Sequence, residues 1–172
     1  MKLVLASKNQ KKLVEMRDIL SHMGVEVCLQ SDVGVDVDVE ETGTTFEENS
    51  LLKARAVMEA SGLPAIADDS GLCVDALGGA PGVYSARYGG PGLDDVGRYR
   101  LLLENMKGQP RGAKFVSVIT CCFPNGDVLT ARGECPGTIA FAPMGEGGFG
   151  YDPVFFIPSL KKTFAQLTPE EK

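Results

Sequence analysis

The beginning of the chain, up to Gly24, carries the pattern of a strand, a loop and a helix, and this pattern restricts the fold more than any other feature. The apolar run at residues 3–6 predicts a short buried strand over residues 2–6. Apolar residues then recur at helical spacing from Leu13 to Met23, and Gly24 ends the helix. The chain is therefore predicted to open with a strand, a loop over residues 7–12 and a helix.

A capping box marks the start of a second helix. Thr45 and Glu48 have the required spacing, and the helix is predicted to run to about Ser61. Gly62 then takes the position that glycine usually occupies after a last helical turn.

Strands and a third helix are predicted in the remainder of the chain. The segments with strand-like composition are residues 64–68, 72–76, 113–123, 128–135 and 154–157. A third helix, capped by Asp94 or Asp95, follows a Gly- and Pro-rich loop over residues 78–92. The Asn125-Gly126 pair between two of the strands predicts a hairpin.

Valine and acidic side chains alternate over residues 32–40. This alternation predicts a half-buried strand or an extended arm with its acids toward solvent. Asp36 and Asp38 also match the D-x-D motif of metal-dependent sugar transferases, but the alternating acids around them favour the polar face of a strand.

Length and charge exclude several classes of protein. At roughly 150 residues per domain, the 172 residues correspond to one domain. The 17 Lys and Arg residues against 23 Asp and Glu residues give a net charge of −6. This charge disfavours broad binding to nucleic acid or to anionic membranes, although a small anion can still bind locally.

Histidine, cysteine and apolar runs narrow the possibilities further. His22 is the only histidine, which excludes a multi-His metal site, and its place in a last helical turn gives it no catalytic role. The five cysteines show no C-x-x-C spacing, which fits buried thiols in a reducing cytosol better than a disulfide framework. The N-terminal apolar run is too short for a signal peptide, and residues 115–123 are too few for a membrane helix. We therefore expect a soluble, cytoplasmic protein.

The loop between the first strand and the first helix is a candidate anion site. It combines small polar side chains with three lysines, in the order Ser7, Lys8, Asn9, Gln10, Lys11 and Lys12. Free backbone N–H groups at a helix N-terminus attract anions, and the lysines add positive charge to the same place.

The sequence Asp68-Asp69-Ser70-Gly71 is a candidate metal site, predicted to end a buried strand and open into a turn. Adjacent carboxylates in a strand point to opposite sides, so one of the two would face a given metal. Glu41 just before the second helix supports Mg²⁺, which takes one or two carboxylates and completes its shell with water and phosphate oxygens. A solvated aspartate turn is the alternative interpretation.

Residues 145–150 match the G-x-G-x-x-G pattern, but Tyr151-Asp152-Pro153 follows and no helix is predicted there, so a dinucleotide-binding turn is excluded. The segment instead predicts a flexible loop that presents two rings, Phe149 and Tyr151, and the Asp152 carboxylate to a base. In the alternative interpretation, the two aromatic residues are ordinary core residues.

Six stretches in order along the chain together resemble the non-canonical purine nucleoside triphosphate pyrophosphatases, also called inosine triphosphate pyrophosphatases or dITP/XTP diphosphatases. The stretches are residues 7–12, 41–49 with 53–54, 67–72, 78–88, 148–153 and 170–172. The resemblance implies an elongated α/β fold with a mixed β-sheet flanked by helices and a substrate cleft between two lobes. Residues 1–172 would form a single nucleotide pyrophosphatase domain.

The resemblance also implies an activity. It implies Mg²⁺-dependent hydrolysis of ITP, dITP or XTP to the monophosphate and pyrophosphate, which cleanses the nucleotide pool, in a cytoplasmic homodimer. Glu41 and Asp69 would be metal ligands, with Asp69 also the proton acceptor. The substrate contacts would be Ser7, Lys8, Asn9, Gln10, Lys11, Lys12, Lys53, Ser70, Phe149, Gly150, Tyr151, Asp152 and Lys172.

The C-terminus departs from the family pattern. Residues 168–171 carry a helix-start signature, yet the sequence ends at Lys172, before the Ser-His-Arg motif and last helix that the resemblance implies. We therefore expect the C-terminal helix to be missing and base discrimination to be weaker. Two alternatives stay open: a nucleotide-binding protein with little turnover, and a Maf-type nucleotide pyrophosphatase, against which residues 149–152 argue.

Overall fold

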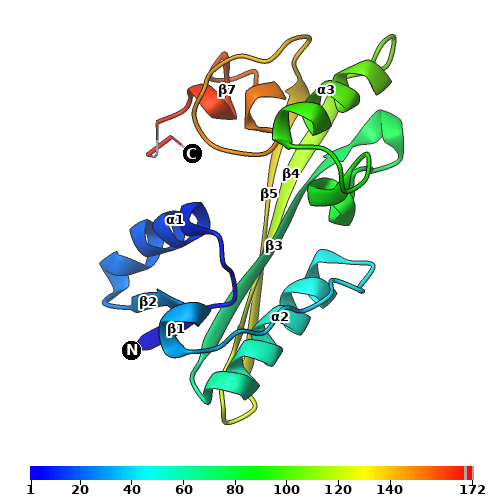
Figure 1. The fold of residues 1–172 in the computed structure, drawn as a ribbon. Coiled ribbons are helices and arrows are strands. Elements are labelled where there is room, and N and C mark those ends of the chain that lie inside the picture. The colour runs from blue at the N-terminus through cyan, green and yellow to red at the C-terminus, as the bar shows by residue number, and fades with distance from the viewer. Residues whose placement is uncertain (169, 172) are drawn as a thin grey trace. The chain divides into compact units, whose positions relative to one another are not determined.

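The computed structural model describes residues 1–168, 170 and 171, which form an α/β fold (Figure 1). In this part of the chain, seven strands make one sheet in the order β2-β1-β3-β4-β5-β6-β7, with parallel and antiparallel pairs. The strands are β1 (Lys2–Leu5), β2 (Glu26–Leu29), β3 (Ala65–Val74), β4 (Gly112–Cys122), β5 (Val128–Ile139), β6 (Phe155–Ile157) and β7 (Lys162–Thr163). The α-helices are α1 (Gln10–Leu20), α2 (Phe46–Ser61) and α3 (Asp95–Asn105). The predicted mixed sheet with flanking helices is confirmed.

The chain divides into two compact units. Unit 1 comprises residues 1–69 and 117–132, and unit 2 comprises residues 70–116 together with the chain from residue 133 onward. Strands β3, β4 and β5 each begin in one unit and end in the other.

In unit 1, strand β1 is central and is buried on both faces. It pairs in parallel with β2 and with β3. Leu3 packs in one apolar cluster with Leu13 of α1, whereas Val4 packs in another with Ala54 and Val57 of α2. Because successive strand residues point to opposite faces, α1 and α2 cover opposite faces of β1 (Figure 1).

The predicted helix caps are confirmed. The Thr45 hydroxyl accepts a hydrogen bond from the Glu48 N–H at 3.1 Å, and Gly62 ends α2 with a φ of 70°. Of the two candidate caps for α3, the structure selects Asp94, whose carboxylate accepts from the Gly97 N–H at 2.8 Å.

The predicted turn at residues 68–71 is wrong. A single strand, β3, runs from Ala65 to Val74, so the Asp-Asp-Ser-Gly sequence lies inside it and the separate strands predicted at 64–68 and 72–76 are one. These residue types favour turns in isolation. Here β1 pairs with the first half of β3, and Leu72 and Val74 are fully buried, so tertiary contacts keep the chain extended.

The alternating segment is an extended arm. It begins after a short 3₁₀ helix, and residues 35–42 have no regular secondary structure. Val35 is buried and Val37 and Val39 are half-buried, while Asp36 and Asp38 are exposed. The predicted alternation of burial is therefore confirmed without a strand. Two short strands of the sheet, β2 and β7, were not predicted.

The hairpin and the core of unit 2 agree with the sequence. The Phe123 N–H donates to the Asp127 carbonyl at 2.9 Å, which closes the turn predicted between β4 and β5. In unit 2, β6 pairs antiparallel with β5 and with β7. Phe155 of β6 is fully buried in one cluster with Leu102 and Met106 from the α3 region.

Among the described residues, no helix is both long and apolar enough to cross a membrane. All five cysteines are free thiols; Cys28, Cys121 and Cys122 are buried, whereas Cys73 and Cys135 are half-buried, so the prediction of buried thiols is wrong for these two.

Candidate active site

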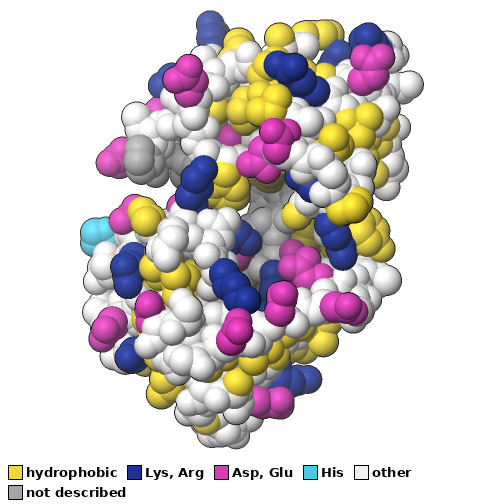
Figure 2. Space-filling view, viewed as in Figure 1, with side chains coloured by type: hydrophobic (Ala, Val, Ile, Leu, Met, Phe, Trp, Pro, Cys, Tyr) yellow, Lys and Arg dark blue, Asp and Glu magenta, His cyan; other side chains and the backbone are white. Residues whose placement is uncertain are grey.

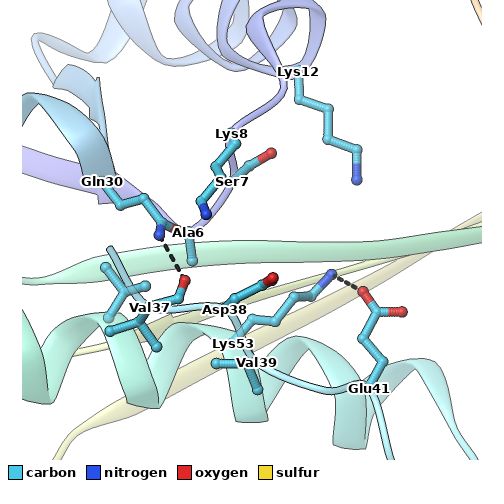
Figure 3. Close-up of a pocket in the computed structure, with 11 residues that line it drawn as sticks. Ala6, Ser7, Lys8, Lys12, Gln30, Val37, Asp38, Val39, Glu41 and Lys53 are labelled. Carbon is cyan, nitrogen blue, oxygen red and sulfur yellow. Dashed lines mark hydrogen bonds and ion pairs between the residues drawn. The ribbon is translucent and has the colours of Figure 1, made fainter. Parts of the chain in front are cut away.

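Unit 1 contains a pocket of about 230 Å³ beyond the C-terminal end of β1 (Figure 3). Its walls come from the loop after β1, the start of α1, the extended arm and α2. The polar lining residues are Ser7, Lys8, Lys12, Gln30, Asp38, Glu41 and Lys53. Ligands of α/β proteins commonly bind at the carboxyl ends of strands, so the pocket lies where the topology favours one.

One lysine joins several acceptors beside this pocket. Lys53 Nζ lies 3.0 Å from Glu41 Oε1, 2.7 Å from the Asp68 carbonyl oxygen and 3.9 Å from Asp69 Oδ1. Its side chain is only 15% exposed. Helix α2 carries this ammonium group and the arm carries Glu41 (Figure 3). Strand β3 carries the two aspartates. Two carboxylates that are far apart in sequence thus converge on one cation.

Asp69 is the most perturbed carboxylate of the site. Its side chain is 8% exposed, and burial raises its pKa from 3.8 to about 6, with Glu41 adding to the rise and Lys53 opposing it. Its Oδ2 atom is buried and has no hydrogen-bond partner among the described residues. A buried carboxylate with an unpaired oxygen is well suited to receive a cation or a proton.

Asp68 points away from Asp69, as expected for neighbours in a strand. Its Oδ1 atom lies 3.1 Å from Lys12 Nζ, whereas Asp69 faces Lys53. Figure 3 shows Lys12 descending from α1 on one side of the strand and Lys53 rising from α2 on the other. Of the two adjacent carboxylates, Asp69 is the one that shares Lys53 with Glu41; that it serves a metal stays a prediction.

Asn49 links the loop that carries Glu41 to helix α2. It is fully buried, and its Oδ1 atom accepts from the Gly43 N–H at 2.8 Å. A Cβ on Gly43 would lie 2.7 Å from this oxygen and 2.6 Å from the Glu48 Cβ, so only glycine allows the approach. The Asn49 amide also favours the charged form of Asp69, although its Nδ2 stays outside hydrogen-bond geometry.

The predicted anion loop is only partly directed at the pocket. Ser7, Lys8 and Lys12 line it, whereas Gln10 and Lys11 are exposed and are not among its lining residues. Asn9 is the N-cap of α1, and its side chain accepts from the Lys11 and Lys12 N–H groups. These N–H groups are therefore satisfied by the cap, and the expectation that they are free for an anion is wrong for this pair.

Glu41 and Asp69 fit a magnesium ion. They already share one cation, and Asp69 Oδ2 is a buried oxygen without a hydrogen-bond partner among the described residues. Among the described residues, no group of three or more His, Cys, Asp or Glu side chains is close enough to hold a metal alone. A two-carboxylate set suits Mg²⁺, which takes its remaining ligands from water and substrate phosphates.

The glycine-rich segment of unit 2 differs from the loop predicted at residues 149–152. Tyr151 is 5% exposed, belongs to the core of unit 2 and donates its hydroxyl to the Ser85 carbonyl at 2.5 Å; burial raises its pKa. The Asp152 carboxylate is buried and accepts from the Phe149 N–H at 3.1 Å. Phe149 and Gly150 are half-buried, and the Gly150 N–H donates to an Asp95 oxygen at 3.1 Å. The exposed-ring interpretation is wrong for Tyr151, where the core interpretation holds.

Two further residues, Ser70 and Lys172, were predicted to contact the substrate. Ser70 is exposed and belongs to unit 2. Lys172 lies outside the described residues. A substrate contact by either residue stays a prediction.

Comparison with known proteins decides the family. The model of the Ham1 family matches residues 3–172. The chain belongs to the Ham1 family. A dITP/XTP pyrophosphatase of Escherichia coli K12 is 51% identical over 176 aligned residues, which cover 99% of this chain and 89% of that protein. A dITP/XTP pyrophosphatase of Haemophilus influenzae is 53% identical, with 99% of this chain and 90% of that protein covered.

Solved structures agree with the Ham1 assignment. A Ham1 protein from Coxiella burnetii matches with a TM-score of 0.91 and 43% identity, covering 99% of this chain and 89% of that chain. The Ham1 protein of Staphylococcus aureus matches with a TM-score of 0.89 and 44% identity, covering 100% and 89%. The resemblance noted in the sequence is therefore confirmed at the level of family and fold.

Sequence reasoning missed part of this Ham1 site. Asn49 and Gly43 lay in a recognised motif but had no assigned role, and Asp38 and Gln30 were not placed at the pocket. The role of Asn49 could be predicted from the sequence, because a polar residue on the buried face of a helix needs a hydrogen-bond partner. No local pattern predicts that Asp38 and Gln30 lie at the pocket. The arm reaches the pocket only through tertiary contacts, such as the 2.8 Å hydrogen bond from Gln30 Nε2 to the Val37 carbonyl.

Proposed function

We propose that this chain hydrolyses non-canonical purine nucleoside triphosphates, namely ITP, dITP and XTP, to the monophosphate and pyrophosphate. The observation that carries the proposal is the convergence of Glu41 and Asp69 on one cation beside a lysine-lined pocket. Full-length relatives named dITP/XTP pyrophosphatases, about half identical to this chain, support the same reaction. Removal of damaged nucleotides from the cellular pool is the corresponding role.

Glu41 and Asp69 would hold Mg²⁺. When bound, this ion supplies positive charge that neutralises phosphate oxygens and favours attack on phosphorus. Glu41 comes from the arm and Asp69 from β3, and Asn49 supports both, because it binds the Gly43 N–H and favours the charged form of Asp69.

Asp69 is suited to accept the proton of the attacking water. A general base is most effective when its pKa lies near the working pH. With a pKa of about 6 in the metal-free protein, Asp69 is ionised at neutral pH yet more basic than an ordinary aspartate.

The lysines are suited to hold the triphosphate. Lys8, Lys12 and Lys53 line one pocket, and each is paired with a carboxylate: Lys8 with Asp36, Lys12 with Asp68, and Lys53 with Glu41. Cations fixed at the position of a leaving pyrophosphate stabilise the charge that develops there. Carboxylate partners keep the ammonium groups ordered until the phosphates arrive.

Base recognition and the cellular setting complete the proposal. Ser70 and residues 149–152 are proposed to contact the nucleoside, as the resemblance implies, and the half-buried Phe149 rather than the buried Tyr151 would supply the stacking ring. We propose that the protein is a cytoplasmic homodimer. We also propose that residues 1–172 form one catalytic domain, which the family match over residues 3–172 supports. Basic and acidic side chains are interspersed on the face seen in Figure 2, and with the net charge of −6 this supports the absence of nucleic-acid or membrane binding.

Product analysis with a panel of nucleotides tests the proposal. The enzyme is incubated with Mg²⁺ and ITP, XTP, ATP, GTP or a pyrimidine triphosphate, and pyrophosphate and orthophosphate are measured separately. Pyrophosphate and IMP in equal amounts from ITP support the proposal. Nucleotide binding without product would favour a binding protein, and turnover of pyrimidine or modified nucleotides alone would favour a Maf-type enzyme.

A further inference from the structure

We infer that Lys53 is an internal counter-ion whose ammonium group takes the place of a divalent metal between Glu41 and Asp69 until a phosphate chain draws it away. The inference rests on the proposed function, because it concerns how metal and nucleotide reach the same site. It assigns Lys53 a role in the order of binding, in addition to any contact with phosphate.

The geometry of the ammonium group is that of a bound cation. Lys53 Nζ has three oxygen neighbours: Glu41 Oε1 at 3.0 Å, the Asp68 carbonyl at 2.7 Å and Asp69 Oδ1 at 3.9 Å. The side chain is 15% exposed, so solvent screens these contacts poorly. A metal that uses Glu41 and Asp69 as ligands needs the space in which this nitrogen lies.

The charges at the site make binding of a metal depend on the presence of a phosphate chain. Two carboxylates already neutralised in part by an ammonium group attract a divalent cation less than two bare carboxylates do. If the metal enters alone, Lys53 loses its carboxylate partner Glu41 and keeps only the Asp68 carbonyl as a close acceptor, in a place where its side chain is 15% exposed. A phosphate chain removes this cost, because it offers the displaced ammonium group new oxygen partners.

The other lysines of the pocket are already engaged elsewhere. Lys12 pairs with Asp68 at 3.1 Å, and Lys8 pairs with Asp36 at 3.1 Å. Because Asp68 and Asp69 point to opposite sides of β3, Lys12 carries the same charge close to the site without standing between Glu41 and Asp69. Lys12 therefore provides a matched control for charge without occupancy.

The experiment measures metal binding in the absence of any nucleotide. Mn²⁺ is titrated into metal-stripped wild-type protein, Lys53→Met and Lys12→Met, and free Mn²⁺ is followed by electron paramagnetic resonance. Removing a cation in contact with a carboxylate commonly changes cation or proton affinity at least tenfold, so Lys53→Met is expected to bind Mn²⁺ about tenfold more tightly than wild type. Lys12→Met is expected to stay within about twofold of wild type, since Lys12 pairs with Asp68 rather than with Glu41 or Asp69.

Two results would overturn the inference: unchanged Mn²⁺ affinity in Lys53→Met, or an equal gain in Lys12→Met, which would reduce the effect to bulk charge. Circular dichroism verifies that each variant is folded, and Lys53→Gln replaces Lys53→Met if the latter is not.

Thermal unfolding gives a second readout. In wild type, Mg²⁺ and pyrophosphate together are expected to raise Tm by more than the sum of their separate shifts, because each ligand removes an obstacle to the other. In Lys53→Met this excess is expected to shrink, and additive shifts in wild type would contradict the linkage. Pyrophosphate release from ITP by the same wild-type preparation tests the proposed function separately, so either idea can fail alone.

Discussion

Replacing Asp69 with asparagine is expected to stabilise the metal-free protein at neutral pH. The substitution is nearly isosteric and removes a charge that burial makes unfavourable, as the rise in pKa from 3.8 to about 6 shows. At about 1.4 kcal/mol per pKa unit, the rise corresponds to about 3 kcal/mol. We expect about 2 kcal/mol, because the side chain keeps 8% exposure and solvent screens part of the cost.

The sign follows from proton linkage. The folded-state pKa of Asp69 lies above its unfolded value, so between about pH 4 and pH 6 the folded protein binds the extra proton. The stability of wild type relative to Asp69→Asn therefore falls as the pH rises through this window, and the full penalty is present above it. A metal bound to the Asp69 carboxylate would offset the cost of its buried charge. The lower stability of the metal-free protein is therefore expected if Asp69 is a metal ligand.

Urea unfolding in EDTA at several pH values measures the effect. The free energy of unfolding of Asp69→Asn minus that of wild type is expected to increase by about 2 kcal/mol between about pH 4 and pH 7.5. Asp36→Asn, which removes an exposed carboxylate, serves as the control for lost charge. If Asp69→Asn and wild type change in parallel over this range, the argument from burial is wrong.

The remaining predictions concern the metal loop, the chemistry and the core of unit 2. Glu41→Gln is expected to lower ITP hydrolysis and to be partly rescued by excess Mg²⁺, since it loses one ligand; a defect insensitive to metal would refute the ligand role. Asp69→Asn is expected to abolish ITP hydrolysis at any Mg²⁺ concentration, and near-wild-type turnover would rule out its catalytic role. Gly43→Ala is expected to raise the Mg²⁺ requirement, because its Cβ would lie 2.7 Å from the Asn49 oxygen; an unchanged Mg²⁺ titration would argue against it. Tyr151→Phe is expected to cost about 1–2 kcal/mol in urea unfolding, because the Ser85 carbonyl loses its donor; unchanged stability would contradict this.

Local signals predicted the helices well. The caps of α2 and α3 depend on residues three positions apart, and the hydrogen bonds of Thr45 and Asp94 form as their spacing indicated. Gly62 ends α2 for a reason equally local, its left-handed backbone. Such features can be predicted from sequence because all the residues involved lie within about one helical turn of one another.

The strands were harder to predict from sequence where pairing across the sheet decides the structure. β2 has only four residues, and its register with β1, such as Leu3 opposite Val27, is what makes it a strand. The same applies to β3, where the Asp-Asp-Ser-Gly composition predicts a turn and burial of the neighbouring Leu72 and Val74 keeps it extended. Composition describes a segment alone, whereas a sheet is made by partners distant in sequence.

The site was predicted in its residue types but not in its connections. The carboxylates Glu41 and Asp69 were recognisable as a pair, yet nothing local indicated that Lys53 would lie between them or that Asn49 would reach the Gly43 N–H. In contrast, the prediction for Tyr151 failed because an aromatic residue in a glycine-rich segment looks the same whether it faces solvent or, as here, the core.

The most direct test of the proposed activity is the ratio of kcat/KM for ITP to that for ATP, with pyrophosphate as the measured product and Mg²⁺ present. Sites that hydrogen-bond a distinguishing group can reject an analogue by about 10⁴, and we expect ITP to be preferred by at least about 10². Pyrophosphate should form in the same amount as IMP, and XTP should behave as ITP does. Equal values for ITP and ATP, or release of orthophosphate instead of pyrophosphate, would contradict the assignment of this chain as a non-canonical purine nucleotide pyrophosphatase.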